Sequence, residues 1–466
     1  MTSLFSNGLN RRQFLSIGAR TLASSGIIAS LSGVQQAFAA TTGAADTSGY
    51  KALVCVYLVG GNDGFNMLAP VTSSAYNTYA KSRSNLALPQ SSLLPLNGVA
   101  SDGASYGFHP SCPELKSLFN GGRMAIMCNV GTLVQPTTVA QAKAASVPLP
   151  LQLFSHADQQ TQWWTSITDK PERNGWAGRI ADFYTDQGYA AKLAMNINIG
   201  GVNYWQEGRK AMPYVLGAGG APQLNVSNNP YFRGGARQKA AQELLSQAQS
   251  DSNLMVAEYA KIQSNAAAKV TLVNNALNAA GDLATQFPSF PADSNLGAQL
   301  HEVARCIKAH NQIGDSRQIF FVQLGGFDTH NGELASQATL LNILSKNINA
   351  FWAAMNEIGL QNSVTLFTAS DFGRSLGSNG DGSDHAWGNH HLVLGGAVKG
   401  GYYGRMPNLT VEGPDDIGAG RIVPTTSTDQ YAGTIAKWFG VADSSLNSIF
   451  PNLANFGTKR NLGFLA

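Results

Sequence analysis

The stretch from Phe367 to Gly396 concentrates residue types that bind metal ions. Its thirty residues include three aspartates and three of the eight histidines of the chain, together with several glycines, although only 13% of the chain is charged. A polar surface loop has a similar composition. The alternative is a metal-centred active site at the edge of a sheet.

Three apolar runs, each typical of a strand, end in a glycine or another small residue that is followed by an aspartate. The first run leads to Asp63, another leads to Asp328 with His330 two residues further on, and another leads to Asp371. In open α/β sheets, ligands bind beyond the carboxyl ends of the strands. If these strands are parallel neighbours, the three carboxylates converge, and their repulsion requires a cation or protons.

The histidine-rich loop adds further ligands. Carboxylates and imidazoles together suit a divalent metal ion, which could be zinc, calcium, magnesium or manganese. His390 and His391 adjoin the start of a strand, so we expect at most one of them to face the site. Asp63, Asp371 and Asp384 could each instead cap a turn or a helix. The predicted metal ligands are Asp63, Asp328, His330, Asp371, Asp384, His385 and His390.

Candidate catalytic residues lie in two places. The segment LFSHADQQTQWW holds Ser155 and His156 at a predicted helix start, where the helix dipole and a nearby cation would favour the alkoxide of Ser155. The same serine could act only as a helix N-cap. Arg374, just after Asp371, could bind an anionic group of a substrate or lie at the surface.

Apolar patterns predict the elements that must position these residues. Apolar residues spaced three and four apart from Leu341 to Ile358 indicate an amphipathic helix between two strand-like runs. Strand, crossover helix and strand form a parallel βαβ unit, which predicts an α/β sandwich with a mostly parallel sheet. Five continuous apolar runs are typical of its buried strands, and they span 51–59, 123–131, 318–326, 363–370 and 391–396.

The chain is predicted to form one domain with an elaboration. Residues 50–466 make up the α/β domain, and residues 40–49 are expected to be a flexible leader. The region at about 140–300 is different, because polar, Trp-containing and Gly-rich segments precede Ala- and Gln-rich helices. We expect this region to cover one edge of the sheet as a helical or irregular cap.

Residues 1–39 have the layout of an export signal. The pair Arg11-Arg12 is followed by a mildly apolar stretch and by the small-residue sequence Ala-Phe-Ala at 37–39. This resembles a twin-arginine signal, which implies the twin-arginine translocation machinery and a signal peptidase as partners. The expected location is the periplasm or the outside of a bacterial cell. No later stretch has 18 uninterrupted apolar residues, so no stable membrane span is expected.

Charge and cysteine content argue against a nucleic-acid-binding protein and against a metal site built from cysteines. The net charge of +3 comes without a long basic run, which argues against nucleic-acid binding. The four cysteines lack metal-ligand spacing. Cys55 and Cys128 lie in apolar runs and are expected to be buried thiols. A disulfide between Cys112 and Cys128 would be compatible with an oxidising compartment.

Five motifs carry a resemblance to a known family. Through them the chain resembles the family called domain of unknown function 1501, exported proteins placed in the alkaline phosphatase-like superfamily with sulfatases and metal-dependent phosphoglycerate mutases. The resemblance runs from about Lys51 to the C-terminus and is weak through 140–300. The motifs are VYLVGGNDGFNMLAP, FHPSCPELKSLFNGGRMAIMCNVG, QLGGFDTH, ASDFGRSLGSNGDGSDHAWGNHHLVLGGAVKGGYYG and RIVPTTSTDQYAGTIAKWFGV.

The resemblance implies an α/β sandwich with two divalent metal ions about 4 Å apart. A serine, threonine or modified cysteine would attack a phosphate or sulfate ester. By motif, Asp63, Asp328 with His330, and Asp371 match metal-binding positions, and one histidine of the late loop completes them. The chain departs from the pattern at Phe372, where relatives often have histidine, unless the pair at 384–385 replaces the lost ligand. It also lacks the Cys-x-Pro-x-Arg signature of sulfatases.

The sequence therefore predicts an exported, metal-dependent hydrolase of a small anionic ester, either a phosphate or a sulfate. The alternative is a non-catalytic, metal-containing binding or assembly protein of the cell envelope. A cofactor-dependent oxidoreductase is disfavoured, because no Gly-x-Gly-x-x-Gly follows a strand.

Overall fold

A computed structural model describes residues 43–220, 236–290 and 295–466 of the chain. The predicted export signal at 1–39 lies outside these residues. Among the described residues, no helix is both long enough and apolar enough to cross a membrane.

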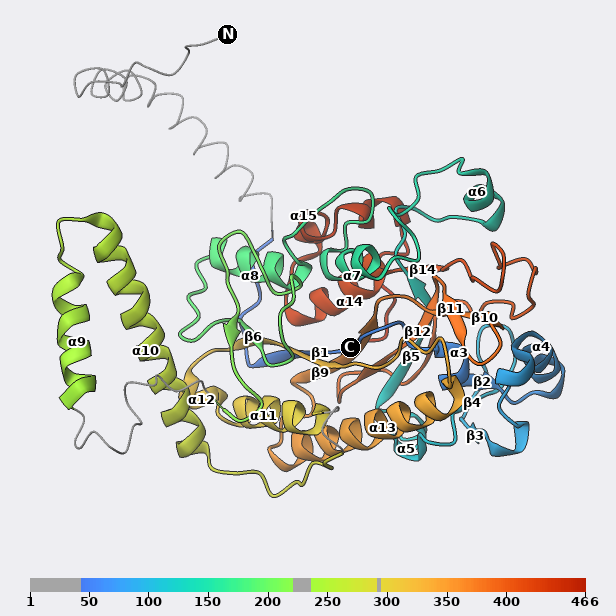
Figure 1. Ribbon diagram of the computed structural model, residues 1–466, viewed down its shortest axis with the longest axis horizontal. Helices are drawn as coiled ribbons and strands as arrows, with labels where there is room; N and C mark the ends of the chain where they lie inside the picture. Colours follow the sequence, from blue (N-terminus) through green and yellow to red (C-terminus); the bar gives the residue numbers. More distant parts are fainter. Residues whose placement is uncertain (1–42, 221–235, 291–294) are drawn as a thin grey trace, which may run out of the picture.

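A nine-stranded, mostly parallel sheet lies at the centre of the molecule (Figure 1). Its strand order is β13-β5-β12-β9-β1-β8-β6-β7, and β14 pairs with β5. The central strand β1 is parallel to both β8 and β9. The strands are β1 (Lys51–Leu58), β5 (Met124–Gly131), β6 (Asn196–Asn198), β7 (Tyr214–Val215), β8 (Arg317–Leu324), β9 (Val364–Ser370), β12 (Asn389–Leu394), β13 (Gly401–Tyr403) and β14 (Thr426–Ser427).

Helices cover both faces of this sheet (Figure 1). The side chains of β1 alternate between the two cores, with Val54 and Val56 on one face and Cys55 and Tyr57 on the other. One face is covered by α5 (Pro113–Asn120), α11 (Leu296–Lys308) and α13 (Glu333–Glu357), and the other by α7 (His156–Thr165), α8 (Trp176–Asp186), α14 (Thr428–Phe439) and α15 (Leu446–Ile449). The α/β sandwich with a mostly parallel sheet is confirmed.

One central strand runs against the others. β12 is antiparallel to both of its neighbours, β5 and β9. Only a hairpin, β10 (Arg374–Ser378) with β11 (Ser383–His385), lies between β9 and β12. A parallel return needs a crossover connection, usually a helix, so this short connection brings the chain back in the opposite direction.

The region 140–300 does more than cap the domain. It adds β6 and β7 to the sheet, beside β8, and places α7 and α8 on one face. Farther along, α9 (Ala236–Ala248) and α10 (Leu254–Ala280) form a hairpin that projects away from the sheet (Figure 1).

The four cysteines are free and buried, so the disulfide considered between Cys112 and Cys128 is not formed.

Candidate metal centre

The carboxyl ends of β1, β8 and β9 meet at one edge of the sheet, because Leu58 pairs with Leu324 on one side and with Ser370 on the other. Gly60 follows β1 with a φ of +113°. A Cβ atom at this position would lie 2.4 Å from the backbone nitrogen of Asp328. Glycine therefore allows the segment after β1 to lie against the aspartate after β8.

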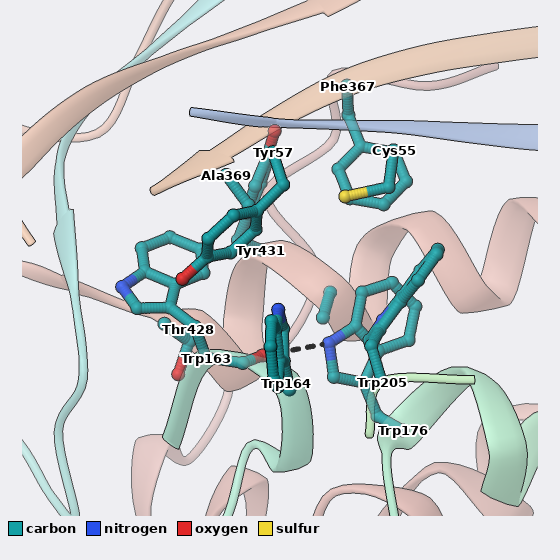
Figure 2. Close-up of a pocket in the computed structure, with 11 residues that line it drawn as sticks. Cys55, Tyr57, Trp163, Trp164, Trp176, Trp205, Phe367, Ala369, Thr428 and Tyr431 are labelled. Carbon is teal, nitrogen blue, oxygen red and sulfur yellow. Dashed lines mark hydrogen bonds between the residues drawn. The ribbon is translucent and has the colours of Figure 1, made fainter. Parts of the chain in front are cut away.

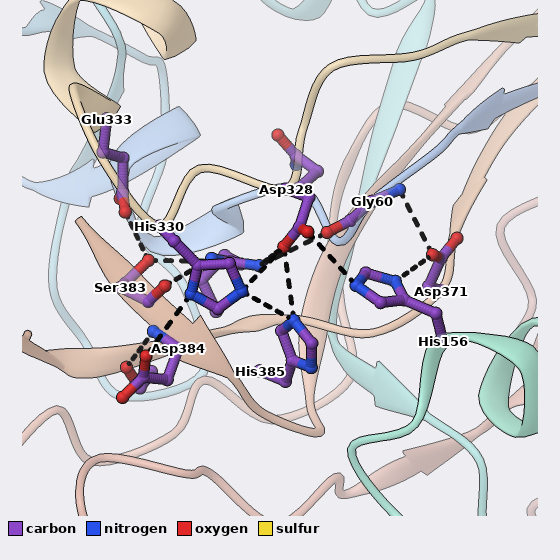
Figure 3. Close-up of polar contacts among 12 residues, drawn as sticks. Gly60, His156, Asp328, His330, Glu333, Asp371, Ser383, Asp384 and His385 are labelled. Carbon is purple, nitrogen blue, oxygen red and sulfur yellow. Dashed lines mark hydrogen bonds and ion pairs between the residues drawn. The ribbon is translucent and has the colours of Figure 1, made fainter.

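Three side chains converge at this edge (Figure 3). One ligand atom from each of His156, Asp328 and His385 lies within 4.8 Å of the other two. Nε2 of His385 is 3.2 Å from Oδ1 of Asp328, and Nε2 of His156 is 3.5 Å from Oδ2 of the same carboxylate. His330 adds a fourth candidate ligand, since its Nε2 is 3.1 Å from Oδ1 of Asp328 and 2.9 Å from Nε2 of His385.

A backbone carbonyl fixes the orientation of His385. Its Nδ1 lies 2.8 Å from the carbonyl oxygen of Phe154, which can only accept a hydrogen bond, so Nδ1 carries the proton. Burial lowers the pKa of His385 and favours the neutral ring. The lone pair of Nε2 therefore faces the carboxylate of Asp328. An arrangement of this kind requires a proton or a cation between the acceptor atoms.

Asp371 orients His156 from behind. Nδ1 of His156 is 2.7 Å from Oδ2 of Asp371, which also accepts a hydrogen bond of 3.2 Å from the backbone nitrogen of Gly60. The bond to Asp371 raises the pKa of His156. It also directs Nε2 of His156 towards Asp328. Metal-binding histidines are commonly held by a carboxylate in this way, so Asp371 acts on the site through His156.

The spacing of these atoms fits a metal ion. Ligand atoms about 2.1 Å from one ion would lie about 3.0 Å from each other in an octahedral site and about 3.4 Å in a tetrahedral one. The contacts of 2.9, 3.1 and 3.2 Å among His330, Asp328 and His385 are close to these values. Imidazole nitrogens with one carboxylate are the donor set of zinc and neighbouring transition metals. His156, Asp328 and His385 would hold the ion, and His330 is an additional candidate ligand through its contacts with Asp328 and His385.

Arg374 positions Asp328. The guanidinium is fully buried, and its Nη1 donates a hydrogen bond of 2.8 Å to Oδ1 of Asp328. Burial raises the pKa of Asp328, but the hydrogen bond and the charge of Arg374 outweigh it and lower the pKa. Other bonds join Arg374 to the Oγ and carbonyl oxygens of Ser383 and to the carbonyl oxygen of Gly60. With these partners, the arginine supports the carboxylate and does not extend towards solvent.

Asp63 belongs to a separate buried cluster. Its Oδ1 caps the short helix α3 (Gly64–Met67) by accepting bonds from the backbone nitrogens of Phe65 and Asn66 at 3.1 and 3.2 Å. Its Oδ2 pairs with the guanidinium of Arg83, which also lies 2.9 Å from Oε1 of Glu333. Both of its oxygens are engaged there, and Asp63 is not part of the group formed by His156, Asp328 and His385.

Of the remaining predicted site residues, one lies at the edge of the histidine cluster and two are engaged elsewhere. Asp384 lies at the rim, where its Oδ1 is 3.5 Å from Nδ1 of His330. His390 is buried elsewhere, and its Nδ1 accepts a bond of 3.1 Å from the backbone nitrogen of Asn129. Burial lowers the pKa of His390 to about 4. The Oγ of Ser155 donates to Asp158 at 2.6 Å, within the first turn of α7.

The supporting residues gave weaker signals in the sequence. Glu333 begins α13 three residues after His330, a position where acidic residues are also common because of the helix dipole. Ser383 precedes two predicted ligands, and its Oγ links Glu333 to Arg374. The carbonyl oxygen of Phe154 has no side-chain signature, and its role follows only from the fold.

An aromatic core lies behind α7 (Figure 2). A cavity of about 10 Å³ is enclosed by Tyr57, Trp163, Trp164, Tyr431 and their neighbours. This volume holds at most one water molecule, so the cavity is too small for a substrate. The indole nitrogen of Trp176 donates to the carbonyl oxygen of Trp163 at 3.2 Å. The packing therefore anchors the helix that carries His156.

The fold and the cluster define an α/β protein with a candidate metal centre at the carboxyl edge of its sheet. The described site is formed by side chains from three separate segments of the chain. The chain belongs to the family described as "Protein of unknown function (DUF1501)", which it matches over residues 50–449. The family resemblance noted in the sequence is thereby confirmed. No curated protein matches the chain.

Solved structures with a similar fold are distant in sequence. A protein in the alkaline phosphatase superfamily from Vibrio parahaemolyticus is 10% identical, with 86% of this chain and 70% of that chain covered and a TM-score of 0.34. The lipoteichoic acid synthase LtaP from Listeria monocytogenes is 10% identical, with coverage of 86% and 74% and a TM-score of 0.34. The C-terminal periplasmic domain of EcEptC from Escherichia coli, in complex with Zn, is 11% identical, with coverage of 75% and 74% and a TM-score of 0.26.

Proposed function

We propose that this protein is a metal-dependent hydrolase of phosphate or sulfate esters. The observation that supports this most strongly is the convergence of His156, Asp328 and His385, at the edge of the sheet where ligands bind in α/β folds. When bound, a divalent ion would supply Lewis-acid chemistry to an ester oxygen. A small anionic ester is the substrate class that such a positive centre attracts.

The protein's own residues prepare this centre. Arg374 holds Asp328 in its ionised form, and Asp371 keeps a proton on Nδ1 of His156. The carbonyl oxygen of Phe154 does the same for His385, so that the two Nε2 atoms face the carboxylate. Of the three histidines at the site, His330 and His156 are the more exposed, with 40% and 37% of their side chains accessible.

A second candidate function is a metal-containing binding or assembly protein without turnover. The observation that favours it concerns Ser155, the predicted nucleophile, whose hydroxyl is bonded to Asp158. A hydroxyl engaged in this way must leave its partner before it can attack an ester. Both candidates require the metal centre, and they differ in turnover.

The test measures metal content and turnover in the same preparations. Purified protein is analysed for bound metals by mass spectrometry and assayed with p-nitrophenyl phosphate, p-nitrophenyl sulfate and a wider panel of esters. We expect stoichiometric metal and ester hydrolysis, and we expect Asp328→Asn and His385→Ala to lose both. His301→Ala is the matched control, because His301 lies on α11 and packs on Phe287, away from the cluster.

The outcomes separate the candidates. Metal with turnover supports the hydrolase, and metal without turnover on any ester supports the binding protein. Normal metal content in Asp328→Asn and in His385→Ala would reject the metal centre. Loss of metal in the His301 control would indicate a general loss of folding.

We also propose that the protein is exported through the twin-arginine route to the periplasm or beyond. The support is the Arg11-Arg12 pair with the Ala-Phe-Ala sequence at 37–39. Replacement of both arginines with lysine should leave uncleaved precursor in the cytoplasm, measured by fractionation and immunoblotting. Normal processing of this variant would instead indicate the general secretory route.

A further inference from the structure

The hairpin of α9 and α10 extends beyond the body of the protein (Figure 1). The C-terminal half of α10 packs against α11 and the short helix α12 (His310–Ile313), and its residues Val273 and Leu277 are buried. The N-terminal half of α10 packs against α9, through a face that includes the buried Ala257 and Ala260. One side of this half is therefore covered, and the other side faces outwards.

The outward side of α10 carries an apolar stripe. Met255, Tyr259, Ile262 and Ala266 follow a spacing of four, three and four residues, which keeps them within about 60° of one another around the helix. The first three are 80%, 63% and 56% exposed. Around the helix, the centre of this face lies about 130° from Ala260 and about 170° from Ala257, the two buried residues on the side towards α9. We call these four residues the α10 stripe.

The charges of the hairpin are balanced. Between Ala236 and Ala266 there are three basic and three acidic residues, so this segment has no net charge. Anionic lipid surfaces and nucleic acids attract clusters of basic residues, which the segment does not have. A neutral surface with an apolar stripe is suited to contact another surface of the same kind.

We propose that the α10 stripe is a docking surface for a second copy of this chain, with the two α10 helices antiparallel about a two-fold axis. The 4-3-4 spacing is the pattern by which helices pack in pairs. In the antiparallel register centred between Ala260 and Lys261, Met255 lies opposite Ala266 of the second copy, and Tyr259 lies opposite Ile262. Each layer joins a larger and a smaller side chain, so the stripe is complementary to itself.

The area of the contact predicts a weak dimer. Met255, Tyr259 and Ile262 offer roughly 200 Å² of apolar surface per copy, at about 100 Å² for a fully exposed side chain. Since about 60% of an interface is apolar, the total is roughly 330 Å² per copy. Two copies together would bury about 700 Å², which is the size of a weak and transient contact.

Sedimentation velocity over a range of concentrations tests the proposal on the full chain. We expect a monomer at low concentration and a dimer at high concentration. Tyr259→Glu combined with Ile262→Glu should weaken the dimer roughly tenfold or more, because it places like charges opposite each other. These positions are exposed, so the fold should remain intact by circular dichroism. Met212→Glu is the matched control, since Met212 is 66% exposed and lies outside the hairpin.

Cysteine crosslinking tests the register. Positions 255 and 266 are eleven residues apart, about 16 Å along one helix, which is too far for a disulfide within one chain. Under oxidation, Met255→Cys combined with Ala266→Cys should form a covalent dimer, whereas Ala266→Cys alone should remain monomeric.

Four results would overturn the proposal. A monomer at all concentrations would do so, as would a dimer that survives the Tyr259→Glu and Ile262→Glu changes. Efficient crosslinking of Ala266→Cys alone would exclude the antiparallel register. Binding of the monomer to phospholipid vesicles, lost in the double glutamate variant, would identify a lipid surface as the occupant of the stripe. The outcome does not depend on the proposed metal chemistry.

Discussion

The buried cluster of Asp63, Arg83 and Glu333 predicts a specific dependence of stability on pH. All three side chains are fully buried, and one arginine offsets only one of the two carboxylates. Burial and the neighbouring Asp63 raise the pKa of Glu333 to about 8, although Arg83 and Ser383 act in the opposite direction. Glu333 therefore keeps its proton in the folded protein at neutral pH. Glu333→Gln, which mimics this protonated form, should remove the pH dependence of the cluster.

The magnitude follows from the difference between the folded and unfolded states. The usual pKa of glutamate is 4.5, so between pH 4.5 and about 8 the folded protein binds one more proton than the unfolded chain. The stabilisation is complete below pH 4.5 and is lost as the pH rises through about 8. At about 1.4 kcal/mol per pH unit, the loss is about 5 kcal/mol at pH 9. With an unfolding entropy of about 2.1 cal/mol/K for each of about 400 residues, this corresponds to about 6 °C in Tm.

Differential scanning calorimetry of the wild type and the variant measures this effect. We expect the difference in Tm, wild type minus Glu333→Gln, to fall by about 5 °C between pH 5 and pH 9, because a part of the stabilisation is already lost at pH 5. Other titrating groups affect both proteins equally and cancel in the difference. Glu258→Gln is a control, because the side chain of Glu258 is 65% exposed and its difference should stay constant. Parallel curves for the wild type and Glu333→Gln would refute the reasoning.

Two further predictions concern the metal centre. Asp371→Asn should lower metal affinity about 10- to 100-fold, because it weakens the hydrogen bond that orients His156. Competition with a chelator measures the affinity, and an unchanged value would mean that Asp371 does not position the ligand. Chelation should make residues 376–390 more accessible to protease, because β11 carries His385 and the turn before it depends on Gly380 at a φ of +123°. Equal cleavage with and without chelator, mapped by mass spectrometry, would contradict this.

Much of the fold could be predicted because its signals are local. Continuous apolar runs marked β1, β5, β8, β9 and β12, and the three- and four-residue spacing marked α13. The direction of β12 could not be predicted in this way. An apolar run has the same composition in either direction, and the direction depends on the connection that precedes it.

The candidate site could be predicted only in part, for a similar reason. Asp63, Asp328 and Asp371 follow strands in the same way in the sequence, but their surroundings differ in the structure. Arg83, twenty residues after Asp63, binds its carboxylate together with Glu333. Such a partner lies on a separate helix, α4 (Ser73–Arg83), and no pattern around Asp63 reveals it.

The position of Phe372 explains how the chain differs from the pattern that it resembles. At the position where the resemblance implied a histidine, the buried Phe372 ring packs against two imidazoles, with its centroid 4.7 Å from that of His156 and 4.6 Å from that of His385. Phenylalanine cannot bind a metal, but it can hold these two rings in place. The additional imidazole comes from His156 on α7, within the region 140–300 where the sequence resemblance is weak. That region therefore supplies a candidate ligand as well as covering the sheet, and a search for the site by motif alone would leave the ligand set incomplete.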